Sequence, residues 1–375
     1  MHLSLAKLEI NGGILGSMSY VETLTGQRPV VIAHRGASGY RPEHTLAAYE
    51  LAIAQGADFI EPDLVMTADG VLIARHDNIL DFTTNVGDLP QLAGKKTTKK
   101  IDGSNHTGWF AEDFTHAEIK QLRARERRSG SIPTPFRPAN CQFDDRWSVP
   151  TLVDVIKLAR AGGVGIYPET KHPTHILQET GHDINQVLLD TLQLHGIRNF
   201  NDLPVYIQSF EVQNLQRLRR EMQKRGMELR LVQLLADHGQ PFDIAQIGGS
   251  TTYADMSTPA GLASIAGYAD GVGPEKYHFI LPKDEAGRLN LGEATSFVRD
   301  AHAARLLVHP YTFRGENRSL PTNFQGKRPQ NELQLGNLVG EIQRFLQTGI
   351  DGFFTDHPDL GSAGSITSPR GGVNP

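Results

Sequence analysis

The chain has 375 residues, 39% of them hydrophobic and 21% charged, with a formal net charge of −5. A core can form at this length, and the single cysteine, Cys141, excludes an intramolecular disulfide and a thiolate-based metal site. The slightly acidic balance argues against nucleic acid as a partner, because binding built on phosphate contacts needs a basic surface. No apolar run of about 18 residues or more occurs, so no membrane span is expected.

The first 29 residues are interpreted as an N-terminal extension. Lys7, Glu9 and Asn11 interrupt their apolar stretch, which is not the pattern of a secretory signal. Either a signal was removed or the chain stays inside the cell, and these residues leave both options open.

An apolar run at residues 30–33 predicts a buried parallel strand, and His34 and Arg35 lie where that strand gives way to a loop at Gly36. Catalytic side chains are favoured at such positions. Imidazole titrates near neutral pH, which suits His34 to proton transfer. The planar fork of donors on Arg35 matches phosphate oxygens.

The second predicted strand, residues 59–65, carries two carboxylates. Glu61 and Asp63 are two residues apart, so both project from one face of the strand, about 7 Å apart. A solvent-facing pair is the alternative, but the apolar neighbours argue against it because unpaired buried charges are costly. Two like charges held together favour a divalent cation.

The segment VLIARHD follows a turn at residues 68–70 and brings His76 and Asp77 to another strand end. We expect His76 to share proton transfer with His34, one accepting and the other donating. Asp77 is expected to orient or support the loop.

Residues 78–147 are too many for an ordinary connection, and they indicate an insertion that could cap the site. Within it, Thr115 and Glu118 have the spacing of a capping box and predict a helix start. The stretch AGKKTTKKIDG, residues 93–103, is interpreted as a basic, solvated loop.

Strand and helix signals then alternate to residue 360. Helices are predicted to end at Gly56, Gly162 and Gly226, where a left-handed residue is favoured. Further strands are predicted at residues 166–171, 204–210, 229–235, 270–274, 305–311 and 351–355. Together with the first two they make eight, which predicts a TIM barrel over residues 30–360 with its active site at the C-terminal strand ends. Residues 361–375, rich in Gly, Ser and Pro, are predicted to be a disordered tail.

The strand at residues 166–171 places Glu169 and Lys171 on one face. Oxygen ligands without thiolates indicate a hard cation, Ca²⁺ or Mg²⁺, and we assign it to Glu61, Asp63 and Glu169. Lys171 adds a point charge suited to binding phosphate. Alternatively, Lys171 forms a structural ion pair with Glu169. A metal, an arginine and two histidines together describe phosphodiester cleavage.

In these motifs and their order the chain resembles the glycerophosphodiester phosphodiesterase family, particularly its larger bacterial periplasmic type. The HRG motif is residues 34–36, PE-x-T is residues 42–45, E-x-D and HD are the pairs at residues 61–63 and 76–77, and E-x-K is residues 169–171. One departure is His44, where family members commonly carry asparagine, and it bears on the positioning of Glu43.

The resemblance implies metal-dependent hydrolysis of glycerophosphodiesters to glycerol 3-phosphate and an alcohol, through a cyclic phosphate, with Ca²⁺ preferred and Mg²⁺ as the option. It implies a small-molecule substrate and an exported, periplasmic or secreted protein, with cytoplasm as the alternative and a homodimer among the oligomeric states left open. Glu43 is placed in the metal or hydrogen-bonding shell. Strands PVYIQSF and LLVHPYTF place Gln208, His309 and Tyr311 near substrate, and His309 could line the pocket by hydrogen bonding.

Three other functions stay open at this point. A lysophospholipase D or related lipid phosphodiesterase could use the same site, and an exposed apolar rim would favour it. A different Mg²⁺ barrel enzyme, such as an aldolase or an enolase-like lyase, fits paired histidines at two early strand ends less well. A catalytically silent binding module would be expected to lose one of the residues assigned to catalysis or metal binding, and this chain keeps them all.

Overall fold

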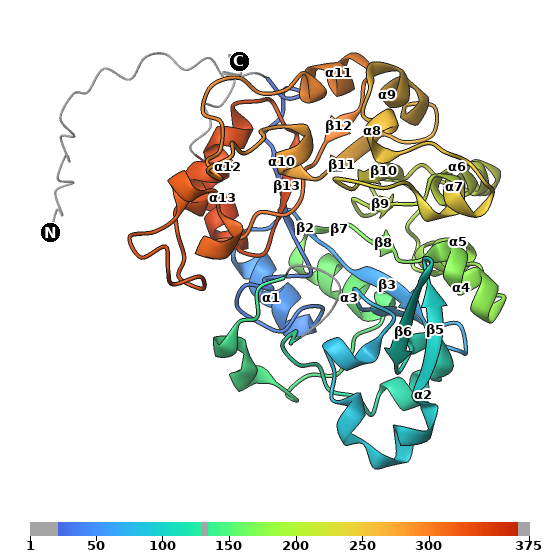
Figure 1. Cartoon of the computed structure of the whole chain (residues 1–375). Coiled ribbons are helices and arrows are strands. Elements are labelled where there is room, and N and C mark those ends of the chain that lie inside the picture. The colour runs from blue at the N-terminus through green and yellow to red at the C-terminus, as the bar shows by residue number, and fades with distance from the viewer. Residues whose placement is uncertain (1–21, 129–133, 367–375) are drawn as a thin grey trace, which may run out of the picture.

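Parallel strands close into a TIM barrel in the part of the chain that this computed structural model describes, residues 22–128 and 134–366 (Figure 1). The barrel strands are β1 (Val30–Ala33), β2 (Phe59–Ile60) with β3 (Asp63–Met66), β7 (Gly165–Ile166) with β8 (Glu169–Thr170), β9 (Tyr206–Ser209), β10 (Arg230–Leu235), β11 (Gly271–Pro274), β12 (Leu307–Val308) and β13 (Gly352–Thr355). Their hydrogen-bonded order is β13-β1-β2-β7 and β12-β11-β10-β9-β8-β3, all parallel. The predicted fold class is confirmed.

Two of the barrel strands are interrupted, and a proline lies at each interruption. Pro62 separates β2 from β3 and Pro168 separates β7 from β8; proline has no N–H to donate to the ladder. The barrel closes between β12 and β13, where the Asp351 N–H donates to the Val308 carbonyl (2.9 Å) and the Phe354 N–H to that of Pro310 (3.1 Å).

Helices surround the strands on the outside of the barrel (Figure 1). They are α1 (Leu46–Ala54), α3 (Leu152–Gly162), α4 (Pro173–Thr180), α5 (Ile184–Leu194), α6 (Val212–Arg225), α7 (Phe242–Gln246), α8 (Tyr253–Met256), α9 (Pro259–Ile265), α10 (Lys276–Phe279), α11 (Phe297–Ala303), α12 (Leu338–Leu346) and α13 (Pro358–Ile366). Among the described residues, none of these helices has the length and apolar character needed to cross a membrane. The compartment implied by the resemblance stays a prediction.

Two predicted boundaries are wrong by a few residues. The left-handed residue that ends α3 is Gly163, with φ 68°, rather than Gly162, which is still helical; two adjacent glycines offer the same freedom, so the sequence does not distinguish them. The predicted tail is helical over residues 361–366, because α13 packs on β1 and the Ser365 hydroxyl donates to the Pro29 carbonyl (3.3 Å). Residues 367–375 and 1–21 lie outside the described part.

The barrel interior is filled by a layer of side chains below the site. It consists largely of aromatic and branched residues: Ile32, Phe59, Tyr167, Tyr206, Val232, Leu307 and Phe354. This layer fills the barrel interior below the C-terminal strand ends, where active sites lie in other barrels of this kind.

The predicted insertion is a separate layer of structure beside the barrel. It contains a hairpin of β5 (Thr97–Ile101) and β6 (Ser104–Gly108) and a short helix, α2 (His116–Ile119), which has the predicted capping box of Thr115 and Glu118. Its core packs against β3 and against β4 (Leu72–Ala74), which runs antiparallel to β3.

The basic stretch at residues 93–103 is largely exposed, as expected, but much of it belongs to the β5–β6 hairpin rather than to a loop. Residues 97–101 form β5, Lys95 pairs with Glu118 (2.7 Å), and Lys99 pairs with Asp113 (2.7 Å). The carboxylates that pair with these lysines follow later in the insertion, so local composition does not reveal them.

Arg75 anchors the loop that follows β1. Its side chain is fully buried and donates to the carbonyls of Glu43 (2.8 Å), His44 (2.7 Å) and Thr83 (3.2 Å). We expect Arg75→Met to lower the free energy of unfolding by about 3 kcal/mol, because it leaves buried carbonyls without donors. Urea unfolding measures this, with the exposed Arg220→Met as the matched control. Equal unfolding free energies for the two variants would contradict it.

Candidate active site

Three carboxylates meet at the C-terminal ends of two neighbouring barrel strands. Glu61 follows β2, Asp63 begins β3 and Glu169 begins β8, and the parallel register pairs Asp63 directly with Glu169. One oxygen from each side chain lies within 4.8 Å of the others, and all three residues are buried. The structure therefore brings together the three residues that the sequence assigned to a metal.

The electrostatics of this carboxylate cluster fit a cation. Burial raises the pKa of Glu169 to about 7, Lys171 opposing the rise and Asp63 adding to it. Burial, Asp63 and Glu169 together raise the pKa of Glu61 well above its usual range. The Asp63 Oδ1 atom is buried without a hydrogen-bond partner among the described residues. A hard divalent ion would compensate this crowded negative charge and take that free oxygen as a ligand.

Two cationic side chains border the carboxylates. The Lys171 ammonium donates to Glu169 Oε1 (2.8 Å), and Arg35 Nε lies 3.4 Å from Asp63 Oδ2. Both are almost fully buried. They place positive charge beside the cluster, where the oxygens of a bound phosphate would meet it.

The two predicted histidines also lie at strand ends, His34 after β1 and His76 shortly after β4. His34 Nδ1 lies 2.6 Å from Asp356 Oδ1, and His76 Nδ1 lies 3.2 Å from Asp77 Oδ1. Burial, with Arg35 adding to it and Asp356 opposing it, lowers the pKa of His34 to about 4. Burial, Arg35 and Lys171 lower the pKa of His76 well below its usual range. Both imidazoles are therefore neutral near pH 7 and able to accept a proton.

Asp356 is a site residue that the sequence analysis missed. It immediately follows β13, and it stays ionised because Arg314 and Arg137 outweigh the effect of burial, which alone would raise its pKa. An ionised acceptor at Nδ1 holds the proton of His34 on that nitrogen and leaves Nε2 as the base. The strand-end rule that selected His34 would have selected Asp356 as well.

The insertion supplies two buried arginines to the site, which the sequence also did not indicate. Arg137 Nη2 lies 2.5 Å from Asp356 Oδ2. Arg127 lies 2.6 Å from Glu43 and 2.6 Å from Asp77. The insertion therefore contacts the partners of both histidines.

Glu43 and His44 both act through neighbouring side chains. Glu43 accepts hydrogen bonds from Arg35 (3.0 Å) and Arg127 (2.6 Å). His44 is fully buried, with Nε2 2.9 Å from Asp63 Oδ2 and Nδ1 2.7 Å from the Tyr49 hydroxyl. It is a structural support of Asp63 rather than a plain loop residue.

Gln208, predicted near substrate, contacts the carboxylate cluster. Its Nε2 donates to Glu61 Oε1 (2.7 Å), and its position on β9 is in register with Glu169. Gln208 therefore orients the Glu61 carboxylate, whose other oxygen accepts a hydrogen bond from the backbone N–H of Arg35 (3.0 Å).

His309 and Tyr311 do not join the cluster. His309 Nδ1 lies 2.9 Å from the Tyr167 hydroxyl, inside the aromatic layer of the barrel interior, so its predicted place in the substrate pocket is wrong. Tyr311 donates to the Leu235 carbonyl (3.0 Å) and packs edge-on against Phe210. His309 therefore lies in the packed interior, whereas Tyr311 is half-buried and lies against Phe210, whose ring lines the cavity described next.

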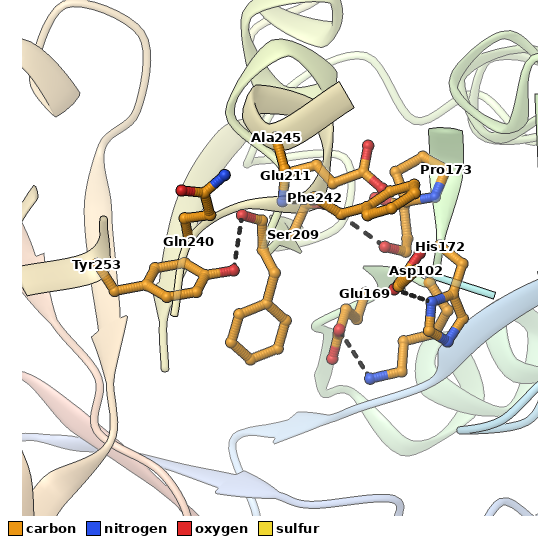
Figure 2. A pocket seen from close by; sticks show the side chains of 13 residues that line it. Asp102, Glu169, His172, Pro173, Ser209, Glu211, Gln240, Phe242, Ala245 and Tyr253 are labelled. Atoms are coloured by element: carbon orange, nitrogen blue, oxygen red, sulfur yellow. Dashed lines mark hydrogen bonds and ion pairs between the residues drawn. The ribbon is translucent and has the colours of Figure 1, made fainter. Parts of the chain in front are cut away.

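A cavity of about 400 Å³ opens beside Glu169 and Lys171 (Figure 2). It extends from these two residues past Phe210 and Glu211 to Tyr253. A space of this size beside the clustered polar groups is typical of a small-molecule site.

Comparisons with known proteins agree with this geometry. The model of the glycerophosphoryl diester phosphodiesterase family matches residues 34–360. A glycerophosphodiester phosphodiesterase of Arabidopsis thaliana is 34% identical over 350 residues, 89% of this chain and 85% of that protein. One from Haemophilus influenzae is 34% identical over 346 residues, 88% of each chain. The structure of an Oleispira antarctica phosphodiesterase with the product sn-glycerol-3-phosphate has a TM-score of 0.57 at 20% identity, covering 92% of this chain and all of that one, and shares the fold.

Proposed function

We propose that this chain, which belongs to the glycerophosphoryl diester phosphodiesterase family, hydrolyses glycerophosphodiesters to glycerol 3-phosphate and an alcohol. The observation that carries the proposal is the meeting of three buried carboxylates with Arg35, Lys171 and two neutral histidines at one end of the barrel. None of the motifs requires this reaction by itself. The reaction is supported because the residues of all these motifs meet at one end of the barrel.

Glu61, Asp63 and Glu169 would hold a divalent cation, which we propose to be Ca²⁺, with Mg²⁺ as the alternative. When bound, the ion supplies a Lewis acid that lowers the pKa of a hydroxyl and offsets charge on phosphate oxygens. Arg35 and Lys171 bind those oxygens and stabilise the charge that develops on them.

The reaction uses a feature of the substrate. A glycerophosphodiester carries a free hydroxyl on the carbon next to its phosphate ester. One histidine removes the proton from this hydroxyl, and its oxygen forms a bond to phosphorus. The bond from phosphorus to the alcohol oxygen breaks, and the other histidine, which enters this step as the imidazolium, protonates that oxygen. The products of this step are the free alcohol and a cyclic phosphate.

The second step reverses the roles of the histidines. The histidine that gave up its proton now takes one from water, and the water oxygen bonds to phosphorus. The bond from phosphorus to the oxygen that attacked in the first step breaks, the first histidine returns its proton to that oxygen, and glycerol 3-phosphate results. His34 is suited to the first proton removal, because ionised Asp356 stabilises the imidazolium that forms. The negative charge of the bound phosphate raises the pKa of the second histidine and so favours the imidazolium that donates the proton.

The function is tested by incubating the protein with glycerophosphocholine and glycerophosphoethanolamine, with Ca²⁺, with Mg²⁺ and with EDTA. A coupled dehydrogenase assay measures glycerol 3-phosphate. We expect release from both substrates with metal and none with EDTA. No release under any condition from protein with a cooperative unfolding transition would contradict the proposal, and lysophospholipids would be the next substrates to test.

We expect Asp356→Asn to lower kcat by about 10²-fold. The amide can donate to Nδ1 of His34, which favours the wrong tautomer, and it no longer stabilises the imidazolium. Asp359→Asn is the matched control, since Asp359 lies three residues on and accepts from the Tyr40 hydroxyl instead. Steady-state kinetics should show the loss in kcat rather than in KM, and a wild-type kcat for Asp356→Asn would contradict the positioning role.

A further inference from the structure

The cavity beside Glu169 and Lys171 is larger than the metal and phosphate sites need. Its far walls come from the loop after β9, from helices α7 and α8, and from the tip of the β5–β6 hairpin in the insertion (Figure 2). A group esterified to a phosphate at Lys171 can extend into this space.

Aromatic rings form one part of the far wall. Phe210 and Tyr253 pack edge to face, with ring centroids 6.1 Å apart, and Phe242 lines the cavity from α7. The Lys171 ammonium lies 6.0 Å from the Phe210 ring, so that ring already borders a cation. Aromatic faces attract ammonium groups through their quadrupoles.

Two carboxylates form another part of the wall. Glu211, only 4% exposed, accepts from the N–H and hydroxyl of Thr174 at the start of α4, and Asp102 pairs with His172 (2.6 Å). Burial raises the pKa of Glu211 to about 7, so an ammonium group in the cavity would favour the ionised form of this carboxyl.

The N-terminus of α6 does not offer a competing anion site. The backbone N–H of Gln213, in its first turn, donates to the carboxylate of Asp243. An aspartate at this place balances the positive end of the helix dipole. The wall is therefore acidic and aromatic, with the cationic Lys171 confined to the end where the phosphate would lie.

We propose that this cavity binds the alcohol half of the substrate and selects alcohols that carry an ammonium group. The inference rests on the proposed function, because it takes the phosphate to lie between Lys171 and the carboxylate cluster. Phe210, Phe242 and Tyr253 provide the aromatic surface, and Glu211 and Asp102 provide the compensating charge.

The insertion completes this subsite. Asp102 and Gly103 form the turn of the β5–β6 hairpin, both with positive φ (45° and 87°), and the turn brings Asp102 to His172 on the barrel. Without the insertion the far wall of the cavity would lack one of its two carboxylates, Asp102 and Glu211. The head-group preference is thus a property of the insertion and barrel together.

The test compares glycerophosphocholine with its 3,3-dimethylbutyl isostere, in which carbon replaces the charged nitrogen. We expect the kcat/KM of the wild type for the choline ester to exceed that for the isostere by about tenfold. Glu211→Gln and Asp102→Asn should each reduce this ratio about threefold, and the double variant should reduce it further. Glu228→Gln, an exposed glutamate before β10 at the opposite end of the barrel, is the matched control and should keep the ratio.

The possible outcomes distinguish a failure of the ammonium subsite from a failure of the proposed phosphodiesterase function. Equal kcat/KM values for the two esters in the wild type would overturn the ammonium subsite while leaving the phosphodiesterase intact. A preference that survives in the double variant would overturn its location. No glycerol 3-phosphate from either ester, with folded protein and metal present, would overturn both proposals.

Discussion

Replacing His34 or His76 with alanine is expected to lower kcat by about 10²- to 10⁴-fold while leaving the fold intact. Each imidazole is proposed to transfer one proton in each of two steps. Both side chains lie at the rim of the barrel rather than in its packed interior, so their loss should leave the barrel core unchanged. The glycerol 3-phosphate assay measures the loss, and urea unfolding checks the fold.

A histidine variant outside the site serves as the control, because it shows whether losing any histidine lowers kcat. His182 is exposed between α4 and α5, and His182→Ala should keep the wild-type kcat. Wild-type turnover in both His34→Ala and His76→Ala would refute their assignment as acid and base. A loss in only one of them would leave the other with a supporting role.

Asp63→Asn and Glu169→Gln are each expected to lower kcat/KM by about 10²-fold or more at micromolar metal. Each substitution removes one of three anionic ligands, and Asp63→Asn also weakens the bonds that hold His44 and Arg35 beside the cluster. Calorimetric titration with Ca²⁺ and Mg²⁺ should show the matching loss of affinity. High metal concentration should restore part of the activity.

A nearby carboxylate outside the cluster provides the control for these variants. Asp69 lies in the turn between β3 and β4, where it accepts from the Thr67 hydroxyl (2.6 Å). Asp69→Asn should bind metal and turn over substrate as the wild type does. Wild-type Ca²⁺ affinity in Asp63→Asn and Glu169→Gln would contradict the assignment of the metal site.

Much of the barrel and the centre of the site can be predicted from the sequence because their signals are local. Each strand is a short apolar run, and the polar residue that follows it falls at the C-terminal edge, where parallel strands converge. Glu61, Asp63 and Glu169 are therefore found together, since adjacent strands in register bring them within reach. Arg35 and Lys171 beside them follow from the same rule.

The residues that the sequence did not indicate act over long separations. Arg137 reaches Asp356 across 219 positions, and Arg127 reaches Glu43 across 84. Both lie in the insertion, where no periodic pattern shows which way a side chain points. The prediction for His309 is wrong for a different reason. The sequence pattern of its strand resembles that of the other strands, but its side chain packs among interior aromatic rings.

The proposed mechanism requires the neighbouring hydroxyl of the substrate to attack phosphorus under histidine catalysis. Its most direct test follows choline release from glycerophosphocholine and from the 2-deoxy analogue that lacks this hydroxyl, with the same metal-loaded protein. We expect release from the first and no release above background from the second, with a cyclic phosphate visible by ³¹P NMR early in the first reaction. Equal release from both esters would contradict it and point to direct attack by water.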